Sequence, residues 1–261
     1  MPENTSNFTT KPKKITSSGE FAWGGEAGWS EDIADRTGVT IESGVAVPTR
    51  FPTDGLLARW KLTESSGDAI DHANGHNGTV YGPQQGVSVD GRTAYTFDGD
   101  NDYIVTADSA LDFTGAFTIS LWWKNGSDSN RQRALDKRDD SGYGYEVVPR
   151  NDVVSVSLGD GNVEHNDVGT TVITDDEWYH IVAVVEAASS GTRTVTAFVN
   201  GEVDGESEFS IGNDLTSSVP LQIGGDGFND RGYYPGSLSH ILMYTRTLNG
   251  SDVQHIYDAT R

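Results

Sequence analysis

Short runs of alternating side chains fill this sequence from residue 54 onward, and they constrain the fold more than any other feature. In each run every second residue is apolar or small, which is typical of a strand with one buried face. Clusters of Gly, Asn and Asp separate the runs at intervals typical of a β-sandwich. Asn200-Gly201 falls between two runs and predicts a hairpin, because both residues of that turn adopt positive φ. The clearest runs are Tyr95/Phe97, Tyr103/Val105, Phe117/Ile119/Leu121/Trp123, Val153/Ser155/Ser157, Ile181/Ala183/Val185 and Val195/Ala197/Val199.

We therefore expect an all-β fold with two packed antiparallel sheets. Six Trp, ten Tyr and nine Phe residues supply its core, and buried aromatic side chains contribute strongly to stability. One short helix is expected near the end of the chain. Asn249 can cap it together with Asp252, and Val253, Ile256 and Tyr257 form an apolar face at helical spacing.

The first 53 residues differ from the rest of the chain. Residues 1–20 are rich in Thr, Ser, Asn, Lys and Pro, a composition that predicts a flexible arm. Residues 21–53 hold two Trp among glycines and acids, with a hairpin pattern at 39–47. Because about thirty residues cannot bury two Trp alone, we expect this segment to pack on the main domain, residues 54–261, or on another subunit. It is predicted to serve in anchoring or oligomerisation.

The charge of the chain is strongly one-sided. It has 18 Lys and Arg against 39 Asp and Glu, a formal net charge of −21. Binding to nucleic acid depends on Lys and Arg that neutralise phosphates, so we expect no nucleic-acid partner. In molar salt the screening length falls to about 3 Å, and the self-repulsion of such a surface largely vanishes. The charge therefore favours adaptation to high salt, with a calcium-rich exterior as the alternative.

Other classes of protein are excluded by what the sequence lacks. No apolar run approaches the ~18 residues that a membrane span needs, so we expect no membrane insertion. The absence of Cys excludes a disulfide scaffold, a thiol nucleophile and a Cys-type zinc site. The first twenty residues have no apolar stretch like that of a signal peptide, so export by that route is not expected.

Five stretches, in family order, resemble the laminin-G-like jelly roll of the concanavalin A-like lectin/glucanase superfamily. The resemblance covers about residues 54–261 and implies a two-sheet antiparallel jelly-roll sandwich, with the short C-terminal helix and an extended N-terminal segment outside it. This fold hosts enzymes, lectins and scaffolds, so the resemblance does not decide the function. The stretches are LLARWKLTESSGDAIDHANGHNGTV (56–80), YTFDGDNDYIVT (95–106), FTISLWWK (117–124), EWYHIVAVV with VTAFVNGEV (177–203) and LQIGGDG with GSLSHILMYTRTL (221–248).

The resemblance implies a structural Ca²⁺ near the edge of the sandwich. Calcium binds six to eight oxygen atoms from carboxylates and carbonyls. Ser239-His240 stands where relatives usually carry Asp-Glu, which removes one carboxylate ligand. The alternative is that the Asp and Asn side chains only shape turns by bonding to nearby backbone. The candidate ligands are Asp71, Asn74, Asp98 and Asp100, with Asp102 as a further oxygen donor.

The histidines give no support for zinc. His72 and His76 are four residues apart but lie in a Gly/Asn-rich loop, so the helical two-histidine geometry is absent. His180 lies where the family commonly has His, among core residues, and is expected to be a hydrogen-bonded structural residue.

A group of three acids resembles the Glu-x-Asp-x-Glu strand of some glucanases on this fold. Simple alternation would place Glu202, Asp204 and Glu206 on one face of a strand, and glycoside hydrolysis needs paired carboxylates. The group directly follows the Asn200-Gly201 turn, however, and Gly205 replaces the bulky residue expected there. We therefore expect no enzymatic activity.

Two long loops are the better candidates for ligand contacts, because binding sites often lie on long loops of a rigid sandwich. Solvated loops or subunit contacts are the alternative. Trp60, Trp123 and Trp178 are expected to pack in the core instead. The loop candidates are Phe228, Arg231, Tyr233 and Tyr234 in residues 225–236, and Arg131, Arg133 and Tyr143 in residues 125–145.

A lectin-like sandwich, no export signal and an acidic surface together fit a virion surface protein of a halophilic virus. A tail-fibre, turret or capsid-decoration subunit would be assembled in the host cytoplasm and act outside the cell. Residues 1–53 would then mediate homo-oligomer and other virion contacts, and the jelly roll would bind a host glycan or surface-layer protein. A stand-alone carbohydrate-binding module and a glycoside hydrolase remain as alternatives.

Overall fold

The computed structural model describes residues 51–106, 111–126, 132–227, 229 and 232–261, together with the backbone of four short strands nearer the N-terminus. The chain divides into two compact units, Met1–Pro52 with His255–Arg261, and Thr53–Gln254. In the first unit the strands form an antiparallel sheet of order β1-β2-β4-β3, and the predicted hairpin near 39–47 is confirmed as β3–β4. These strands are β1 (Lys14–Ile15), β2 (Phe21–Ala22), β3 (Val39–Glu42) and β4 (Val45–Pro48).

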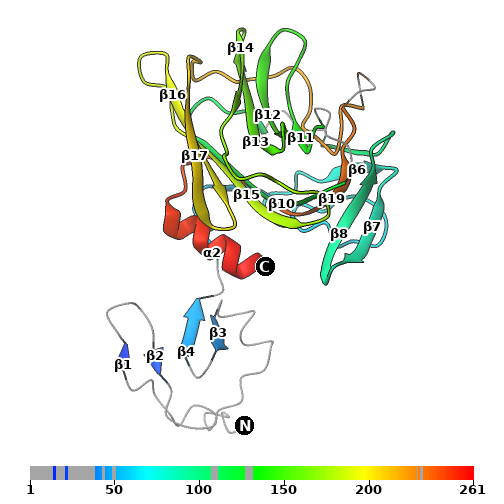
Figure 1. The fold of residues 1–261 in the computed structure, drawn as a ribbon, viewed down its shortest axis with the longest axis vertical. Coiled ribbons are helices and arrows are strands. Elements are labelled where there is room, and N and C mark those ends of the chain that lie inside the picture. Colours follow the sequence, from blue (N-terminus) through cyan, green and yellow to red (C-terminus); the bar gives the residue numbers. More distant parts are fainter. Residues whose placement is uncertain are drawn as a thin grey trace, which may run out of the picture. The chain divides into compact units, whose positions relative to one another are not determined.

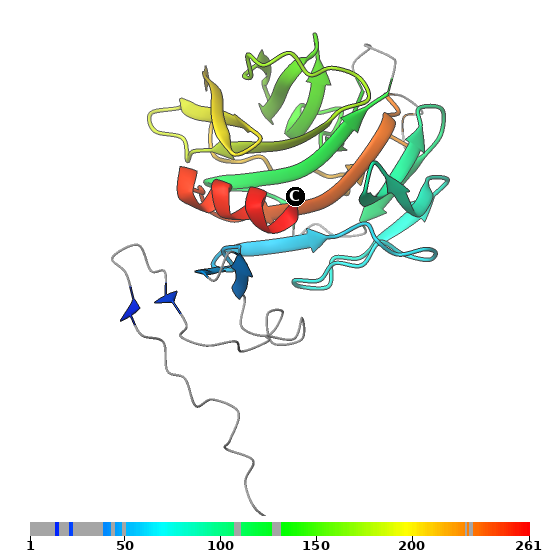
Figure 2. The same ribbon diagram turned by 60° about the horizontal axis from the view of Figure 1, so that its bottom comes forward.

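The second unit contains an eight-stranded antiparallel sheet. Its order is β17-β16-β15-β10-β19-β8-β7, and β5 also pairs with β19. The central strands β10 and β19 lie side by side across the curved sheet (Figure 2). The strands are β5 (Leu56–Trp60), β7 (Gln84–Val89), β8 (Arg92–Asp98), β10 (Phe117–Asn125), β15 (Trp178–Val185), β16 (Arg193–Val199), β17 (Glu202–Phe209) and β19 (Pro235–Tyr244).

A seven-stranded antiparallel sheet, also in the second unit, is stacked on this eight-stranded sheet (Figure 1). Its order is β14-β13-β12-β11-β18-β9-β6. The predicted two-sheet sandwich is therefore confirmed. The strands are β6 (Gly78–Tyr81), β9 (Tyr103–Thr106), β11 (Leu135–Asp136), β12 (Tyr143–Arg150), β13 (Val153–Asp160), β14 (Val163–Asp167) and β18 (Gln222–Ile223).

The core lies between the two sheets, and four of the six alternating runs named from the sequence face it. The other two runs, Tyr103/Val105 and Val153/Ser155/Ser157, lie on the outer face instead, and their neighbours Ile104, Val154 and Val156 are buried. Trp60 and Trp123 are completely buried in the core, as predicted. Trp178 differs from the prediction: it is half-buried, shares the outer face with Lys124, and donates its indole N–H to the carbonyl of Val89 at 3.1 Å. Trp178 faces outward because it is an odd number of positions before the core residues Ile181 and Ala183 in β15, and alternate side chains of a strand face opposite sides.

Two local predictions are confirmed by the backbone. Asn200 and Gly201 have φ of 52° and 89° in the turn between β16 and β17, as this type of hairpin requires. Helix α2 (Gly250–Thr260) begins after Asn249, whose Oδ1 accepts a hydrogen bond from the N–H of Asp252 at 2.9 Å. Val253 and Ile256 are buried.

Among the described residues no helix has the length and apolar character to cross a membrane.

Candidate ligand-binding face of the seven-stranded sheet

A row of polar side chains crosses the outer face of the seven-stranded sheet. The strand register places its members directly opposite one another from β18 through β11, β12 and β13 to β14. Side chains alternate between the two faces of a strand, and the neighbours Leu135, Val147 and Ile223 face the core. We call this set the polar row; it consists of Gln222, Asp136, Glu146, Ser157 and His165.

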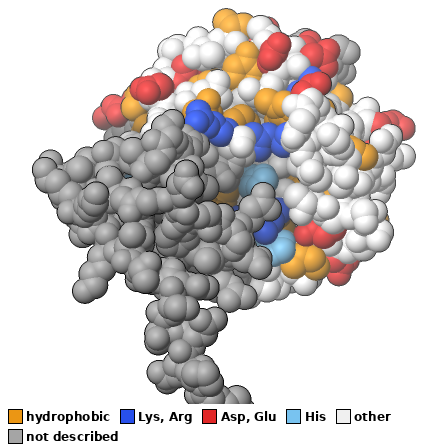
Figure 3. Space-filling view, turned by 90° about the horizontal axis from the view of Figure 1, so that it is seen from below, with side chains coloured by type: hydrophobic (Ala, Val, Ile, Leu, Met, Phe, Trp, Pro, Cys, Tyr) orange, Lys and Arg blue, Asp and Glu red, His pale blue; other side chains and the backbone are white. Residues whose placement is uncertain are grey.

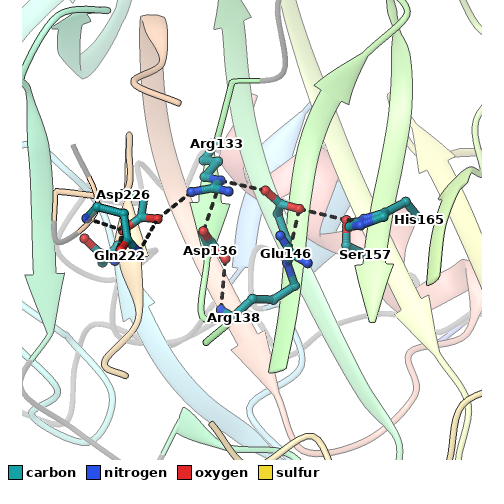
Figure 4. A network of polar contacts seen from close by, with 9 residues as sticks. Arg133, Asp136, Arg138, Glu146, Ser157, His165, Gln222 and Asp226 are labelled. Carbon is teal, nitrogen blue, oxygen red and sulfur yellow. Dashed lines mark hydrogen bonds and ion pairs between the residues drawn. The ribbon is translucent and has the colours of Figure 1, made fainter. Parts of the chain in front are cut away.

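Arg133 connects the polar row to the loop that follows β18. Its Nε lies 2.9 Å from Glu146 and 3.1 Å from Asp136, and its Nη1 lies 2.6 Å from Asp226 (Figure 4). All four side chains are buried. Burial, and then the charge of Glu146, raise the pKa of Asp136 to about 6. Buried carboxylates need such partners to remain charged. The guanidinium of Arg133 therefore stabilises the carboxylates of Asp136, Glu146 and Asp226 on this face of the sheet.

The same arginine brings together the two loops that the sequence suggested separately. The N–H of Arg133 donates to the carbonyl of Gly232 at 2.9 Å, and the N–H of Gly224 donates to the carbonyl of Ala134 at 3.1 Å. The described parts of residues 125–145 and 225–236 therefore border one region at the edge of the polar row.

Three tyrosines form a cluster beside this region. The rings of Tyr81 and Tyr103, paired across β6 and β9, are stacked with centroids 4.7 Å apart. Tyr233 lies 6.3 Å from Tyr103, with its ring tilted by 38°. Tyr81 is 46% exposed, and the other two are half-buried. We call Tyr81, Tyr103 and Tyr233 the tyrosine cluster.

Glycines let the loop after β18 pass directly over these rings. A Cβ on Gly227 would collide with the ring of Tyr103, and one on Gly225 would collide with the ring of Tyr233. The loop can therefore lie on the aromatic surface only because these residues have no side chain.

The predicted ligand residues have different outcomes. Phe228, Arg231 and Arg131 lie outside the described residues. Tyr233 belongs to the tyrosine cluster, and whether it contacts a ligand stays a prediction. Tyr234 is fully buried, and its hydroxyl lies 3.3 Å from the amide oxygen of Asn125, so its ring is not accessible to a ligand.

Tyr143 lies against a different turn from the other candidate ligand residues. It lies at the start of β12, opposite Asp160 and three positions before Glu146. A Cβ on Gly161 would come 3.0 Å from its hydroxyl, which places the ring against the turn between β13 and β14.

Sequence reasoning missed Tyr81, Tyr103 and Gln222 as site residues. For Tyr103 the sequence pattern pointed the other way, because the run Tyr103/Val105 was expected to face the core, whereas Ile104 and Thr106 are the buried residues of β9. The pairing of β9 with β6 and β18, which brings Tyr81 and Gln222 to it, depends on contacts distant in sequence.

Asp71 organises the loop that surrounds it. Its two carboxylate oxygens accept hydrogen bonds from the backbone N–H groups of Arg59, Ala73, Asn74 and His76 at 2.7–3.1 Å. Burial alone would raise its pKa, but these four bonds hold the pKa below its usual value. Asn74 uses its amide to donate to the carbonyls of Leu56 and Leu57. This arrangement is the turn-shaping alternative.

The second predicted metal group has the same character. Asp98 Oδ1 accepts the N–H of Asp100 at 2.9 Å, and Asp102 Oδ2 accepts the N–H of Asp98 at 2.9 Å. Within the part of the chain that the structure describes, no three His, Asp or Glu side chains are arranged to hold a metal ion. Calcium binding stays a prediction that this geometry does not support.

The three acids of β17 do not share a face. A bulge interrupts the pairing at Asp204, so that Glu202 lies opposite the buried Val199 and Glu206 lies opposite the outward Thr196. Asp204 accepts hydrogen bonds from the backbone N–H groups of Thr170 and Thr171. The alternation assumed from the sequence is therefore wrong here, and the group lacks the paired geometry of a glycosidase.

The polar row also lacks the features of a catalytic group. Asp136 and Glu146 are buried and bound to Arg133, whereas a general acid must reach its substrate. Ser157 donates its hydroxyl hydrogen to Glu146 at 2.7 Å, so His165 Nδ1, at 2.6 Å, must donate to Ser157. A histidine that donates to the hydroxyl cannot act as its base.

The outer face of the eight-stranded sheet carries basic and histidine side chains, which gather on the face shown in Figure 3. Arg92 stacks over the ring of Trp122 at 3.7 Å. His180 is fully buried and its Nε2 lies 2.9 Å from the hydroxyl of Ser120, which confirms a structural histidine. Burial, then the charges of Arg92 and His240, lower the pKa of His180 to about 3.

Two antiparallel sheets packed face to face, one with clustered tyrosines on its outer side, define a lectin-like β-sandwich. The model of the laminin-G-type domain of the concanavalin A-like lectin/glucanases superfamily matches residues 98–254. The chain belongs to this superfamily. Among curated proteins none matches this sequence significantly.

Solved structures show the same fold at low sequence identity. The binding domain of Paraclostridial mosquitocidal protein 1 has a TM-score of 0.61 and 15% identity, covering 78% of this chain and 52% of that chain. The receptor-binding domain of botulinum neurotoxin C/D mosaic serotype has a TM-score of 0.58 and 12% identity, covering 78% and 51%. Trypanosoma rangeli sialidase in complex with sialic acid has a TM-score of 0.60 and 15% identity, covering 84% and 35%.

This chain thus spans about half the length of the two toxin domains. Identities this low establish a common fold and nothing about a shared ligand. The toxin structures are binding domains, whereas the superfamily also includes glucanases.

Proposed function

We propose that this protein is a non-catalytic lectin-like module that binds glycans through the tyrosine cluster and the adjoining edge of the polar row. The observation that carries the proposal is the stacked, partly exposed pair Tyr81 and Tyr103 with Tyr233 beside it. An aromatic ring has an apolar face and, in Tyr, a polar tip. Sugar rings present apolar C–H faces and hydroxyl groups, which suit such a surface.

The fold relatives supply consistent support. The binding domain of botulinum neurotoxin DC has been solved in complex with SialylT, and cell entry of botulinum neurotoxin type C depends on interaction with two ganglioside molecules. Glycan binding is thus known among proteins of this fold. The locked carboxylates of the polar row and the split acids of β17 favour binding over hydrolysis.

The proposal is tested with an array of immobilised oligosaccharides. Wild-type protein is expected to bind at least one glycan. Tyr81→Ala, which removes the exposed ring of the cluster, is expected to reduce that affinity at least about 10-fold, because stacking on an aromatic ring contributes ~1–3 kcal/mol in comparable sites. Tyr257→Ala, on α2, is the matched control and is expected to bind normally. Binding to no glycan, or equal binding by Tyr81→Ala, would contradict the proposal.

The biological setting is a further part of the proposal. We place the module on the virion surface of a halophilic virus, with residues 1–53 mediating homo-oligomerisation and contacts to other virion proteins. The support is the net charge of −21 and the separate N-terminal unit. Mass measurement in about 2 M salt, where charge is screened, should give an oligomer that is lost on deletion of residues 1–50. A monomeric full-length protein would contradict this setting.

A further inference from the structure

We infer that the outer face of the eight-stranded sheet binds an acidic stretch of a second copy of this chain, residues 23–35, through Arg59, Lys61 and Arg92. The inference rests on the proposed oligomer-forming role of residues 1–53 and names the surface that receives them. It depends on a cluster of cations in an acidic protein, on a bulge of β19 beside this cluster, and on the composition of the partner segment.

Basic side chains are rare in this chain, and three of them lie together on one face. The chain has 18 Lys and Arg against 39 Asp and Glu. Arg59 and Lys61 flank the core residue Trp60, so their side chains face away from the core. Arg92 begins β8, and its guanidinium lies 3.7 Å from the ring of Trp122 on the same outer side. Figure 3 shows Lys, Arg and His side chains gathered on this face. We call Arg59, Lys61 and Arg92 the cationic cluster.

A bulge in the central strand β19 brings His240 to the cationic cluster. The pairing of β19 with β10 shifts between Ser239 and Leu242. His240 has φ of 46° there, a conformation that costs free energy for any residue other than glycine. Its N–H donates to the carbonyl of Lys61 at 3.2 Å. Because bulges re-aim side chains and are frequent beside functional sites, this local strain favours a binding role for the face.

The electrostatic potential at the cationic cluster is positive although the whole chain is strongly acidic. Burial, then the charges of Arg92, Arg59 and Lys61, lower the pKa of His240 to about 4. Among the described residues the ammonium group of Lys61 has no carboxylate partner. Neighbouring cations repel one another, and a partner that carries several carboxylates offsets this repulsion. The face therefore fits an acidic partner.

Residues 23–35 have the composition that such a face requires. The segment WGGEAGWSEDIAD contains four acidic side chains, two Trp and no Lys or Arg, and it lies outside the described residues. Its carboxylates can pair with guanidinium and ammonium groups, and its indole rings can lie against cations. A segment this short cannot bury two Trp by itself, so it needs a surface of this kind.

A second copy supplies the segment in the oligomer that we propose. In concentrated salt the long-range repulsion between chains of charge −21 is screened, whereas ion pairs that become partly buried at a contact are screened much less. The contact is therefore expected under the same salt conditions in which the oligomer is measured.

The test is charge reversal in the full-length chain, with self-association measured by sedimentation in about 2 M NaCl. The face variant combines Lys61→Glu with Arg92→Glu, and the segment variant combines Glu31→Lys with Asp32→Lys. Each variant alone should self-associate at least 10-fold more weakly, because like charges then meet across the interface. An equimolar mixture of the two should assemble again, since each contact between unlike chains has either the native charges or both sets reversed.

Two further variants serve as controls. Arg150→Glu, in β12 of the other sheet, makes the same charge change away from the cationic cluster and should self-associate normally. Lys61→Glu alone is used if the double face variant does not fold, because this half-buried side chain has no carboxylate partner among the described residues. It should still weaken self-association at least 3-fold.

The outcomes separate this inference from the proposed function. Unchanged self-association of the face variant overturns the inference, even if that variant loses affinity for an acidic polysaccharide such as polygalacturonate, and leaves oligomerisation through residues 1–53 standing. A mixture that stays monomeric, as expected if the segment binds within its own chain, also overturns the inference. A monomeric wild-type protein overturns both the inference and the oligomeric setting, whereas glycan binding is decided separately by Tyr81→Ala.

Discussion

Several residues of this protein have a structural role that could not be predicted from their type alone. Asp71 and Asp204 look like ligands or catalytic acids in the sequence, and both are used to bind backbone N–H groups. Tyr233 and Tyr234 are adjacent, yet one lies in the tyrosine cluster and the other in the core. Tyr234 is in phase with the buried Leu238, but the sequence did not show that the strand pattern extends back to these loop residues, so it did not decide which Tyr faces outward.

The buried His180 predicts a pH dependence of stability. Its pKa is about 3 in the folded protein and ~6.5 when unfolded. As pH falls from about 6.5, the unfolded state gains a proton that the folded state does not bind. Stability is thus fully present above pH ~6.5 and is lost by up to ~1.4 kcal/mol per pH unit as pH falls toward 3.

This prediction is checked by urea unfolding of wild type and His180→Gln between pH 7.5 and 4.5. Gln places its amide near the position of Nε2 and does not titrate, so its slope with pH should be shallower. His240, whose pKa burial and nearby Arg92 lower to about 4, retains part of the slope. Parallel curves for the two proteins would refute the assignment.

Strands and loops show which parts of the structure were predictable. The strands β10, β15 and β16 follow directly from alternating sequence, because burial on one face imposes a period of two. The sequence does not show which strands pair with one another in each sheet. It also does not show the hydrogen bond between Arg133 and Asp226, which are 93 residues apart. The candidate site was therefore predicted as two unrelated loops, while its central tyrosines were assigned only to strands.

A buried lysine fastens the seven-stranded sheet to its connecting segments. Lys137, directly after β11, is completely buried, and its Nζ lies 2.5 Å from Asp112 and 3.0 Å from the carbonyl of Val219. Removing one partner of a buried ion pair leaves an uncompensated charge. Lys137→Met should therefore lower the free energy of unfolding by ~3–5 kcal/mol, measured by urea denaturation.

Two control variants distinguish the effect of losing the ion pair from the effect of losing a basic side chain. Arg261→Met, at an exposed position, should change stability by less than ~0.5 kcal/mol. Adding Asp112→Leu to Lys137→Met should recover part of the loss, because no charge then remains unpaired. If the double variant is as unstable as the sum of both single variants, the pair does not act as described.

The whole molecule combines a rigid sandwich with an unusually acidic composition. The net charge of −21 opposes folding at low salt by self-repulsion. Because salt screens this repulsion, the melting temperature should rise by at least ~4 °C between 0.1 M and 2 M NaCl, equivalent to ~1–2 kcal/mol for a chain of this size. An unchanged or lower melting temperature would argue against adaptation to salt.

At this scale the central claim is that one face of the sandwich, the outer side of the seven-stranded sheet, holds the ligand. The most direct measurement is a map of backbone amide NMR shifts on titration with a glycan that the array identifies. The account predicts that the perturbed residues concentrate at Tyr81, Tyr103, Gln222, residues 224–227 and Tyr233. Perturbations confined to the eight-stranded sheet or to β17 would contradict it.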